Sequence, residues 1–128
     1  MVKIFILILI FRMSVAYSQQ VFSTPEQLPI FDGDIIAYVN SQVCYPYEAI
    51  EQKLEDKVFV SFMVDTLGQT YNHMIMKGRY SVLNKEAIRV ARTIKFVSPA
   101  QNKGRAIKFN YIIPIDFKLS KQKGKRCK

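Results

Sequence analysis

The sequence predicts an α+β fold, a small antiparallel sheet of about three strands with helices packed on it. Residues 56–64 alternate apolar with other side chains, as a half-buried strand does, and Asp65-Thr-Leu-Gly68 follows as a hairpin turn. Residues 82–95 instead carry apolar side chains at the three- and four-residue spacing of an amphipathic helix. The 128 residues leave room for one domain.

The strand over 56–64 organises the rest of the chain. Its alternation predicts one face buried beneath a helix and a second, less buried face. The first face comprises Val58, Val60, Phe62 and Val64, and the second Phe59, Ser61 and Met63. A second strand, Gln69 to Lys77, is expected to return antiparallel.

Two short helices are expected before this strand. Asp34 can cap the first, and Pro46 suits the first turn of the second. Their inward faces are predicted to be Ile36, Val39 and Val43 for the first helix, and Tyr47, Ile50 and Leu54 for the second.

A longer helix, Val82 to Lys95, is expected after the second strand, with Ser81 as its cap. Its predicted core face is Leu83, Ala87, Val90, Ala91 and Ile94, and its solvent face is Lys85, Glu86, Arg89 and Arg92. A loop over Pro99 to Gly104 and a final strand from Ala106 to Leu119 complete the domain.

The N-terminus resembles a secretory signal peptide. Lys3 precedes eight uninterrupted apolar residues, and Ala16-Tyr-Ser18 fits a small-x-small cleavage site, so residues 1–18 are expected to be removed. A membrane anchor is the alternative, but a helix over residues 4–17 would span only about 21 Å of a hydrocarbon core of roughly 30 Å. A periplasmic location is therefore expected rather than anchoring in the inner membrane, with residues 19–28 as an extended leader.

The net charge of +9 comes mainly from the two ends. Between residues 19 and 117 there are 11 basic and 10 acidic residues, whereas residues 118–128 hold six basic residues and no acid. A disordered, solvated tail over 120–128 is expected, with attraction to anionic lipid or lipopolysaccharide as the functional alternative. Nucleic acid is not expected as a partner, because export is expected and the tail lacks the interleaved aromatic residues of a stacking surface. Cys44 is expected to be a small buried side chain and Cys127 an exposed thiol.

Nothing in the sequence predicts catalysis. His73 is the one histidine, no Cys/His cluster has metal-ligand spacing, and no Gly-rich loop precedes a helix. We therefore expect no enzyme activity, no metal and no cofactor.

Over residues 29–119 the chain resembles the TonB C-terminal domain family, in the variety abundant in exported proteins of the Bacteroidetes type. The motifs that carry the resemblance are Pro29-x-Phe31-x-Gly33, Tyr45-Pro46-x-x-Ala49, Val58-x-Val60-x-Phe62-x-Val64-Asp65-x-x-Gly68, Gly78, Leu83-x-x-Glu86-Ala87-x-Arg89, Pro99 with Gly104, and Pro114-Ile-x-Phe117.

The resemblance implies a non-catalytic periplasmic domain associated with transmembrane transport. Such a domain would bind an extended, TonB-box-like segment of an outer-membrane TonB-dependent receptor or of another envelope protein. Unlike the energy-transducing protein of the family, this chain is expected to have neither a transmembrane helix nor a long Pro-rich linker. The alternative is a structural envelope-surface protein whose basic tail contacts anionic lipid. The oligomeric state is left open.

Pro114 directs attention to the last strand as a binding site. Proline cannot donate a ladder hydrogen bond, so strands that contain it are usually edges, and an edge can accept an extended peptide. In the family this strand receives the receptor segment, and the stretch before Tyr45-Pro46 lies at the receptor contact. The candidate partner-binding residues are Gln42, Tyr45, Lys108, Phe109, Asn110, Tyr111, Ile112 and Ile113. The competing interpretation is an edge protected against aggregation by Lys108, Pro114 and Lys118.

Overall fold

The computed structural model describes residues 24–121 and the residue pair 126–127; the predicted signal peptide lies outside these ranges. The elements are α2 (Ile35–Gln42), β1 (Tyr45–Pro46), α3 (Tyr47–Glu51), β2 (Asp56–Val64), β3 (Thr70–Lys77), α4 (Ser81–Ala91), β4 (Ala100–Asn102), β5 (Arg105–Ile107), β6 (Phe109–Phe117), the 3-10 helix η2 (Leu119–Lys121) and β7 (Arg126–Cys127). No helix in the described ranges is long and apolar enough to cross a membrane.

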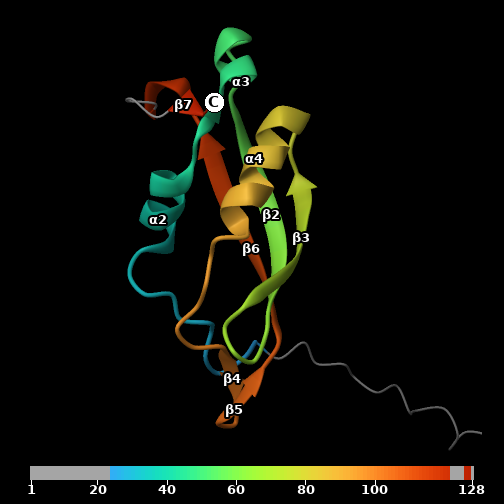
Figure 1. Cartoon of the computed structure of the whole chain (residues 1–128). Helices are drawn as coiled ribbons and strands as arrows, with labels where there is room; N and C mark the ends of the chain where they lie inside the picture. The colour runs from blue at the N-terminus through green and yellow to red at the C-terminus, as the bar shows by residue number, and fades with distance from the viewer. Residues whose placement is uncertain (1–23, 122–125, 128) are drawn as a thin grey trace, which may run out of the picture.

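The main sheet has three antiparallel strands in the order β3-β2-β6, which confirms the predicted α+β architecture. α4 lies across this sheet, with α2 beside it and α3 at one end of the molecule (Figure 1). The small hairpin of β4 and β5 lies at the opposite end.

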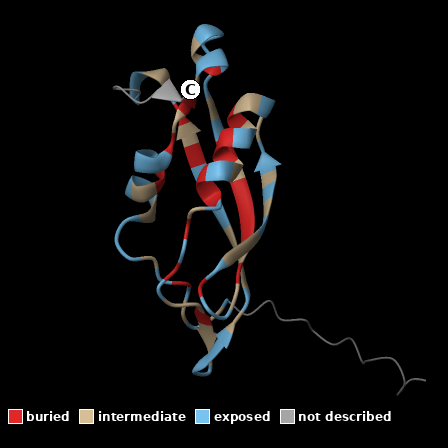
Figure 2. Ribbon diagram, viewed as in Figure 1, coloured by how far each residue is buried: buried red, intermediate tan, exposed pale blue. Residues whose placement is uncertain are grey.

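The core lies between β2 and α4, as the periodicities predict. Val58, Val60, Phe62 and Val64 of β2 are all fully buried. Opposite them, the apolar face of α4 contributes the side chains that the spacing indicates: Leu83, Ala87, Val90, Ala91 and Ile94, of which Ile94 follows the helix. Figure 2 shows this buried layer where α4 crosses the sheet.

The β2–β3 turn depends on two residues. The Asp65 carboxylate accepts hydrogen bonds from the backbone N–H groups of Leu67 and Gln69, at 2.8 and 2.9 Å. Gly68 has φ +82°, and a Cβ there would lie 2.3 Å from the carbonyl oxygen of Phe96. Glycine is therefore required both by its backbone conformation and by the close approach of Phe96.

The short helices differ in part from the prediction. Asp34 caps α2 as expected, accepting from the N–H groups of Ile36 and Ala37, but Ile36 itself is exposed. In α3 Tyr47 is exposed instead of facing inward, and Ala49 is the fully buried residue. Ile50 and Leu54 are partly buried against the core as predicted, whereas Tyr47 is not, and Pro46 precedes α3 as the cap instead of entering its first turn.

The C-terminal half is also more divided than predicted. α4 ends at Ala91, and Ser81 is its first residue while Tyr80 takes the cap position. The region predicted as a loop contains β4, which pairs with β5 around a turn where Lys103 and Gly104 have positive φ. The last predicted strand is therefore two strands, β5 and β6, because pairing with β4 takes the first part away from the main sheet.

Cys44 corrects a further prediction, because it is disulfide-bonded rather than a free buried thiol. The chain's other cysteine, Cys127, has a side chain outside the described part of the chain. Its backbone lies in β7, which pairs parallel with β1 in the register Tyr45 to Arg126 and Pro46 to Cys127. Of the predicted disordered tail, residues 122–125 and 128 are outside the described ranges.

Tyr45 anchors β1 in the core. Its ring is fully buried and meets Phe117 edge-on with 5.8 Å between centroids, and its hydroxyl donates to the carbonyl of Leu54. Burial, followed by the charges of Glu55 and Asp116, raises the pKa of Tyr45 to about 12. The hydroxyl is therefore held protonated as a donor.

Because the two faces of β2 are buried to different extents, shortening a side chain should lower the free energy of unfolding by different amounts on the two faces. Phe62→Ala should lower the free energy of unfolding by about 3–5 kcal/mol, because it leaves a cavity beneath α4. Phe59→Ala, on the half-buried second face that carries no helix, should cost clearly less. Urea denaturation of both variants measures the difference, and equal costs would show that the two faces contribute equally.

The raised pKa of Tyr45 predicts that the free energy of unfolding depends on pH. An unfolded tyrosine ionises near pH 10, so the stability that the raised pKa provides is present below about pH 10 and is lost as pH rises towards about 12. Tyr45→Phe should cost about 1–2 kcal/mol at neutral pH, because the Leu54 carbonyl loses its donor. The gap between wild type and variant, measured by denaturation, should narrow above pH 10 or so; a gap that does not change with pH would contradict this assignment.

Candidate protein-binding site

The candidate strand β6 lies at an edge of the main sheet. It pairs with β2 along its whole length, from Asp56 opposite Phe117 to Val64 opposite Phe109. Within the described part of the chain no strand pairs with its other side. The edge character that Pro114 predicted is therefore present in the structure.

Pro114 also indicates which backbone groups of β6 point away from β2. In an antiparallel pair, successive residues direct their N–H and C=O alternately towards the partner strand and away from it. Pro114 stands opposite Phe59 and has no N–H, so it occupies a position whose groups face away from β2. Asn110 and Ile112, four and two residues earlier, share that direction.

The β2–β3 turn gives the same result independently. The N–H of Asp65, the residue after β2, donates to the carbonyl of Gln69 at 2.8 Å. The backbone groups of the odd-numbered residues of β2 therefore point towards β3. Even-numbered β2 residues then bond towards β6, where their partners are odd-numbered, as Val60 opposite Ile113 illustrates. In the described ranges no hydrogen bond occupies the outward backbone groups of Asn110 and Ile112.

The candidate side chains divide between the two faces of β6. Ile113 is buried in the core, while Phe109 and Tyr111 are half-buried with ring centroids 6.3 Å apart. Ile112 is 50% exposed on the second face. Beside it, the side-chain oxygen of Asn110 accepts from the Ser61 hydroxyl at 2.8 Å.

The other three candidate residues lie outside β6. Lys108 is exposed between β5 and β6. Gln42 is the exposed last residue of α2, a helix that contacts β6. Tyr45 is fully buried, so its side chain supports the core and is not part of the surface. The structure thus brings the β6 residues together and separates Tyr45 from them.

Glu86 is a further residue whose burial differs from the sequence prediction. Predicted to face solvent, it is only 7% exposed and accepts hydrogen bonds from Arg89 Nε. Burial raises the pKa of Glu86, while Arg89 and the backbone N–H of Cys44 act in the opposite direction. The three-residue spacing of Glu86 and Arg89 within the family motif was the available sequence signal for this pair.

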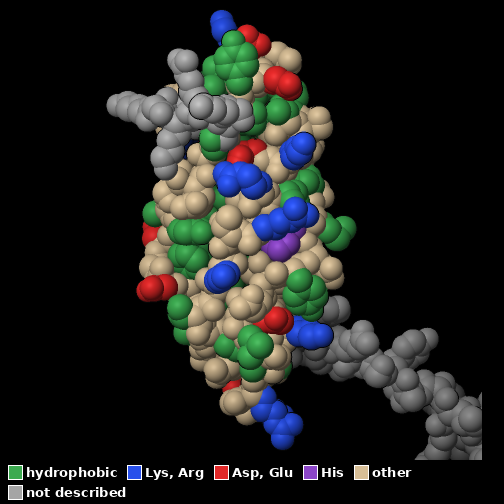
Figure 3. Space-filling model, in the orientation of Figure 1, with side chains coloured by type: hydrophobic (Ala, Val, Ile, Leu, Met, Phe, Trp, Pro, Cys, Tyr) green, Lys and Arg blue, Asp and Glu red, His purple; other side chains and the backbone are tan. Residues whose placement is uncertain are grey.

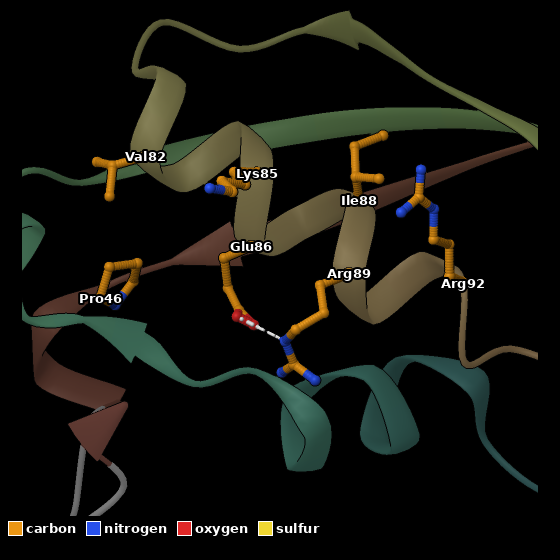
Figure 4. A pocket seen from close by; sticks show the side chains of 7 residues that line it. All are labelled: Pro46, Val82, Lys85, Glu86, Ile88, Arg89 and Arg92. Carbon is orange, nitrogen blue, oxygen red and sulfur yellow. Dashed lines mark hydrogen bonds and ion pairs between the residues drawn. The ribbon is translucent and has the colours of Figure 1, made fainter. Parts of the chain in front are cut away.

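Arg89 extends this pair to the segment before β1. Its Nη2 donates to the backbone carbonyl of Gln42 at 2.9 Å. Glu86 and Arg89 therefore connect α4 to both Gln42 and Cys44, and position the end of α2 against the helix. Figure 4 shows the two side chains directed towards each other, with Arg89 reaching towards α2.

The described ranges hold no group of titratable side chains suited to binding a metal ion. No cluster of three or more His, Cys, Asp or Glu side chains with metal-binding geometry occurs there. His73 stacks near Phe62 with ring centroids 5.5 Å apart, and burial, then the charge of Arg92, lowers its pKa. It is held mainly neutral at pH 7 as part of the packing.

Comparison with known proteins identifies the family. The family model described as Gram-negative bacterial TonB protein C-terminal matches residues 41–119. A solution structure of the Helicobacter pylori TonB C-terminal domain matches with a TM-score of 0.53 and 23% identity, covering 66% of this chain and 89% of that one. A longer fragment of the same domain gives a TM-score of 0.50 and 22% identity, covering 65% of this chain and 75% of that one. No curated protein matches the chain.

The family match spans more than half of the chain, and the solved structures share its fold. TonB C-terminal domains are non-catalytic interaction domains of the bacterial envelope that are associated with transport through outer-membrane receptors. This chain belongs to the TonB C-terminal domain family.

Proposed function

We propose that this chain acts in the periplasm by binding an extended, TonB-box-like segment of an outer-membrane receptor or another envelope protein. The segment adds to the free edge of β6 as a further strand. The observation that carries the proposal is the open edge at Asn110 and Ile112, whose outward N–H and C=O groups have no partner in the described ranges. This is the β-augmentation mode of peptide recognition.

The backbone at this edge supports a binding segment of limited length. Asn110 and Ile112 offer both a donor and an acceptor, whereas Pro114 offers only its carbonyl. Each ladder hydrogen bond contributes about 1 kcal/mol net, so backbone pairing alone gives modest affinity. Pro114 thus limits the edge at one end, which favours a short segment over uncontrolled pairing with another sheet.

Side chains beside the edge would add selectivity. The exposed Ile112 lies on the second face, and Tyr111 and Phe109 border the core face. Alternate side chains of an added strand would meet these two environments in turn. The receptor segment would therefore be selected by its apolar alternation as well as by its extended backbone.

The alternative role, contact of the basic tail with anionic lipid, depends on residues 118–128. Of these, the structure describes only 118–121 and the pair 126–127. The lysines at positions 118 and 121 both lie within 4 Å of the Asp116 carboxylate, at 3.7 and 3.3 Å. The binding edge on β6 is therefore the better supported proposal.

Ile112→Pro tests the proposed edge. Proline removes the outward N–H at this position, so the affinity for a TonB-box peptide, measured by isothermal titration calorimetry, should fall about fivefold to tenfold. The fold should persist, because an edge strand tolerates proline at an outward-facing position, as Pro114 already demonstrates.

Thr66→Pro is the matched control. Thr66 is exposed at the second position of the β2–β3 turn, where proline is favoured, and its N–H makes no hydrogen bond within the described ranges. This variant should bind the peptide as wild type does. Unchanged affinity in Ile112→Pro, or an equal loss in both variants, would contradict binding at β6.

A further inference from the structure

A hollow on the exposed side of α4 lies apart from the β6 edge. It has a volume of about 700 Å³ and is lined by Pro46 of β1 and by Val82, Lys85, Glu86, Ile88, Arg89 and Arg92. We call it the α4 groove. These residues run from the first turn of α4 to the residue that follows its end, a length of about 15 Å. An extended peptide of roughly five residues has the same length.

Most of the charged side chains that line the α4 groove are basic. Lys85, Arg89 and Arg92 follow one another at four- and three-residue spacing, so they share the exposed side of the helix. Lysine and arginine side chains gather over this part of the surface in Figure 3. Neither Lys85 nor Arg92 has an acidic partner within 4 Å among the residues that the structure describes.

Glu86 does not neutralise the positive charge that a partner would meet in the α4 groove. It is buried and already bound to Arg89, whose guanidinium also donates to the Gln42 carbonyl. Arg89 is therefore fixed in place, while Lys85 and Arg92 on either side of it stay available. His73, which faces Arg92, adds no negative charge, and its pKa is lowered.

Apolar side chains accompany these cations. Pro46, Val82 and Ile88 are half-buried and line the same hollow. Val82 and Ile88 also pack against the core, and Pro46 comes from β1, so the hollow offers apolar contacts beside its cations. The mixture suits a peptide that brings both carboxylates and aliphatic contacts.

We infer that the α4 groove binds an extended acidic segment of a partner protein, with carboxylates at alternate positions. Alternate residues of an extended chain lie about 6.6 Å apart on one face. The two available cations, Lys85 and Arg92, are seven residues apart, about 10 Å along the helix. This distance falls between two and four residues of an extended chain, about 6.6 and 13 Å, so alternate carboxylates lie within reach of both long side chains. This surface is separate from the β6 edge and does not depend on strand addition.

The test uses a fluorescein-labelled octapeptide of alternating Asp and Ala, with the Asn-Ala peptide as its uncharged match. The Asp peptide should bind the full chain saturably by fluorescence anisotropy, with an affinity that falls as salt is added. Lys85→Glu/Arg92→Glu should weaken it at least tenfold, and Lys85→Gln/Arg92→Gln by a smaller factor.

Lys77→Glu/Arg105→Glu is the matched control, because it makes the same change of net charge at two exposed positions outside the groove. It should stay within about twofold of wild type if binding is local rather than due to overall charge. Ile112→Pro should also bind the Asp peptide normally, which separates this site from the β6 edge. Absence of saturable binding, equal binding of the Asn peptide, or equal losses in the two charge-reversal pairs would each overturn the inference.

Discussion

Burial of one face of β2 is the interaction on which the rest of the structure depends. Its four core-facing side chains are fully buried beneath α4. A shift of one residue would turn all of them to the opposite face, so the hydrophobic pattern fixes the uninterrupted register of β2 with β6. That register places Pro114 opposite Phe59. The same contacts that stabilise the fold therefore decide which backbone groups of β6 are left for a partner.

A polar connection completes this arrangement on the helix side. The buried Glu86 and its partner Arg89 tie α4 to the backbone at Gln42 and Cys44. A carboxylate in this position would be costly without its donors, so the pair also specifies how α2 and β1 approach the helix. Because Arg89 is held by these bonds, the neighbouring Lys85 and Arg92 carry the unpaired charge of the α4 groove.

The features that could be predicted from the sequence are local ones. The alternation of β2, the spacing of α4, the Asp65 turn and the Asp34 cap each depend on residues close in sequence, and the structure confirms them. The edge position of β6 could be predicted because Pro114 lacks an N–H. Resemblance to the family predicted which edge to consider.

The features that sequence could not predict depend on distant contacts. Burial of Glu86 requires the backbone of the α2–β1 segment, more than forty residues away in sequence, as the Arg89–Gln42 bond at a separation of 47 illustrates. Tyr45 was predicted at the surface, but the Leu54 carbonyl and Phe117 hold it in the core. The disulfide of Cys44 and the pairing of β1 with β7, an early and a late element of the chain, likewise could not be predicted from local patterns.

Residue-resolved amide hydrogen exchange, without and with a TonB-box peptide, tests the central claim most directly. In the free chain the Tyr111 and Ile113 amides should exchange slowly and those of Asn110 and Ile112 quickly, because only the former bond to β2. The peptide should slow exchange at Asn110 and Ile112 while leaving β3 unchanged. Slow exchange at both residues in the free chain, or new protection confined to β3, would contradict the account.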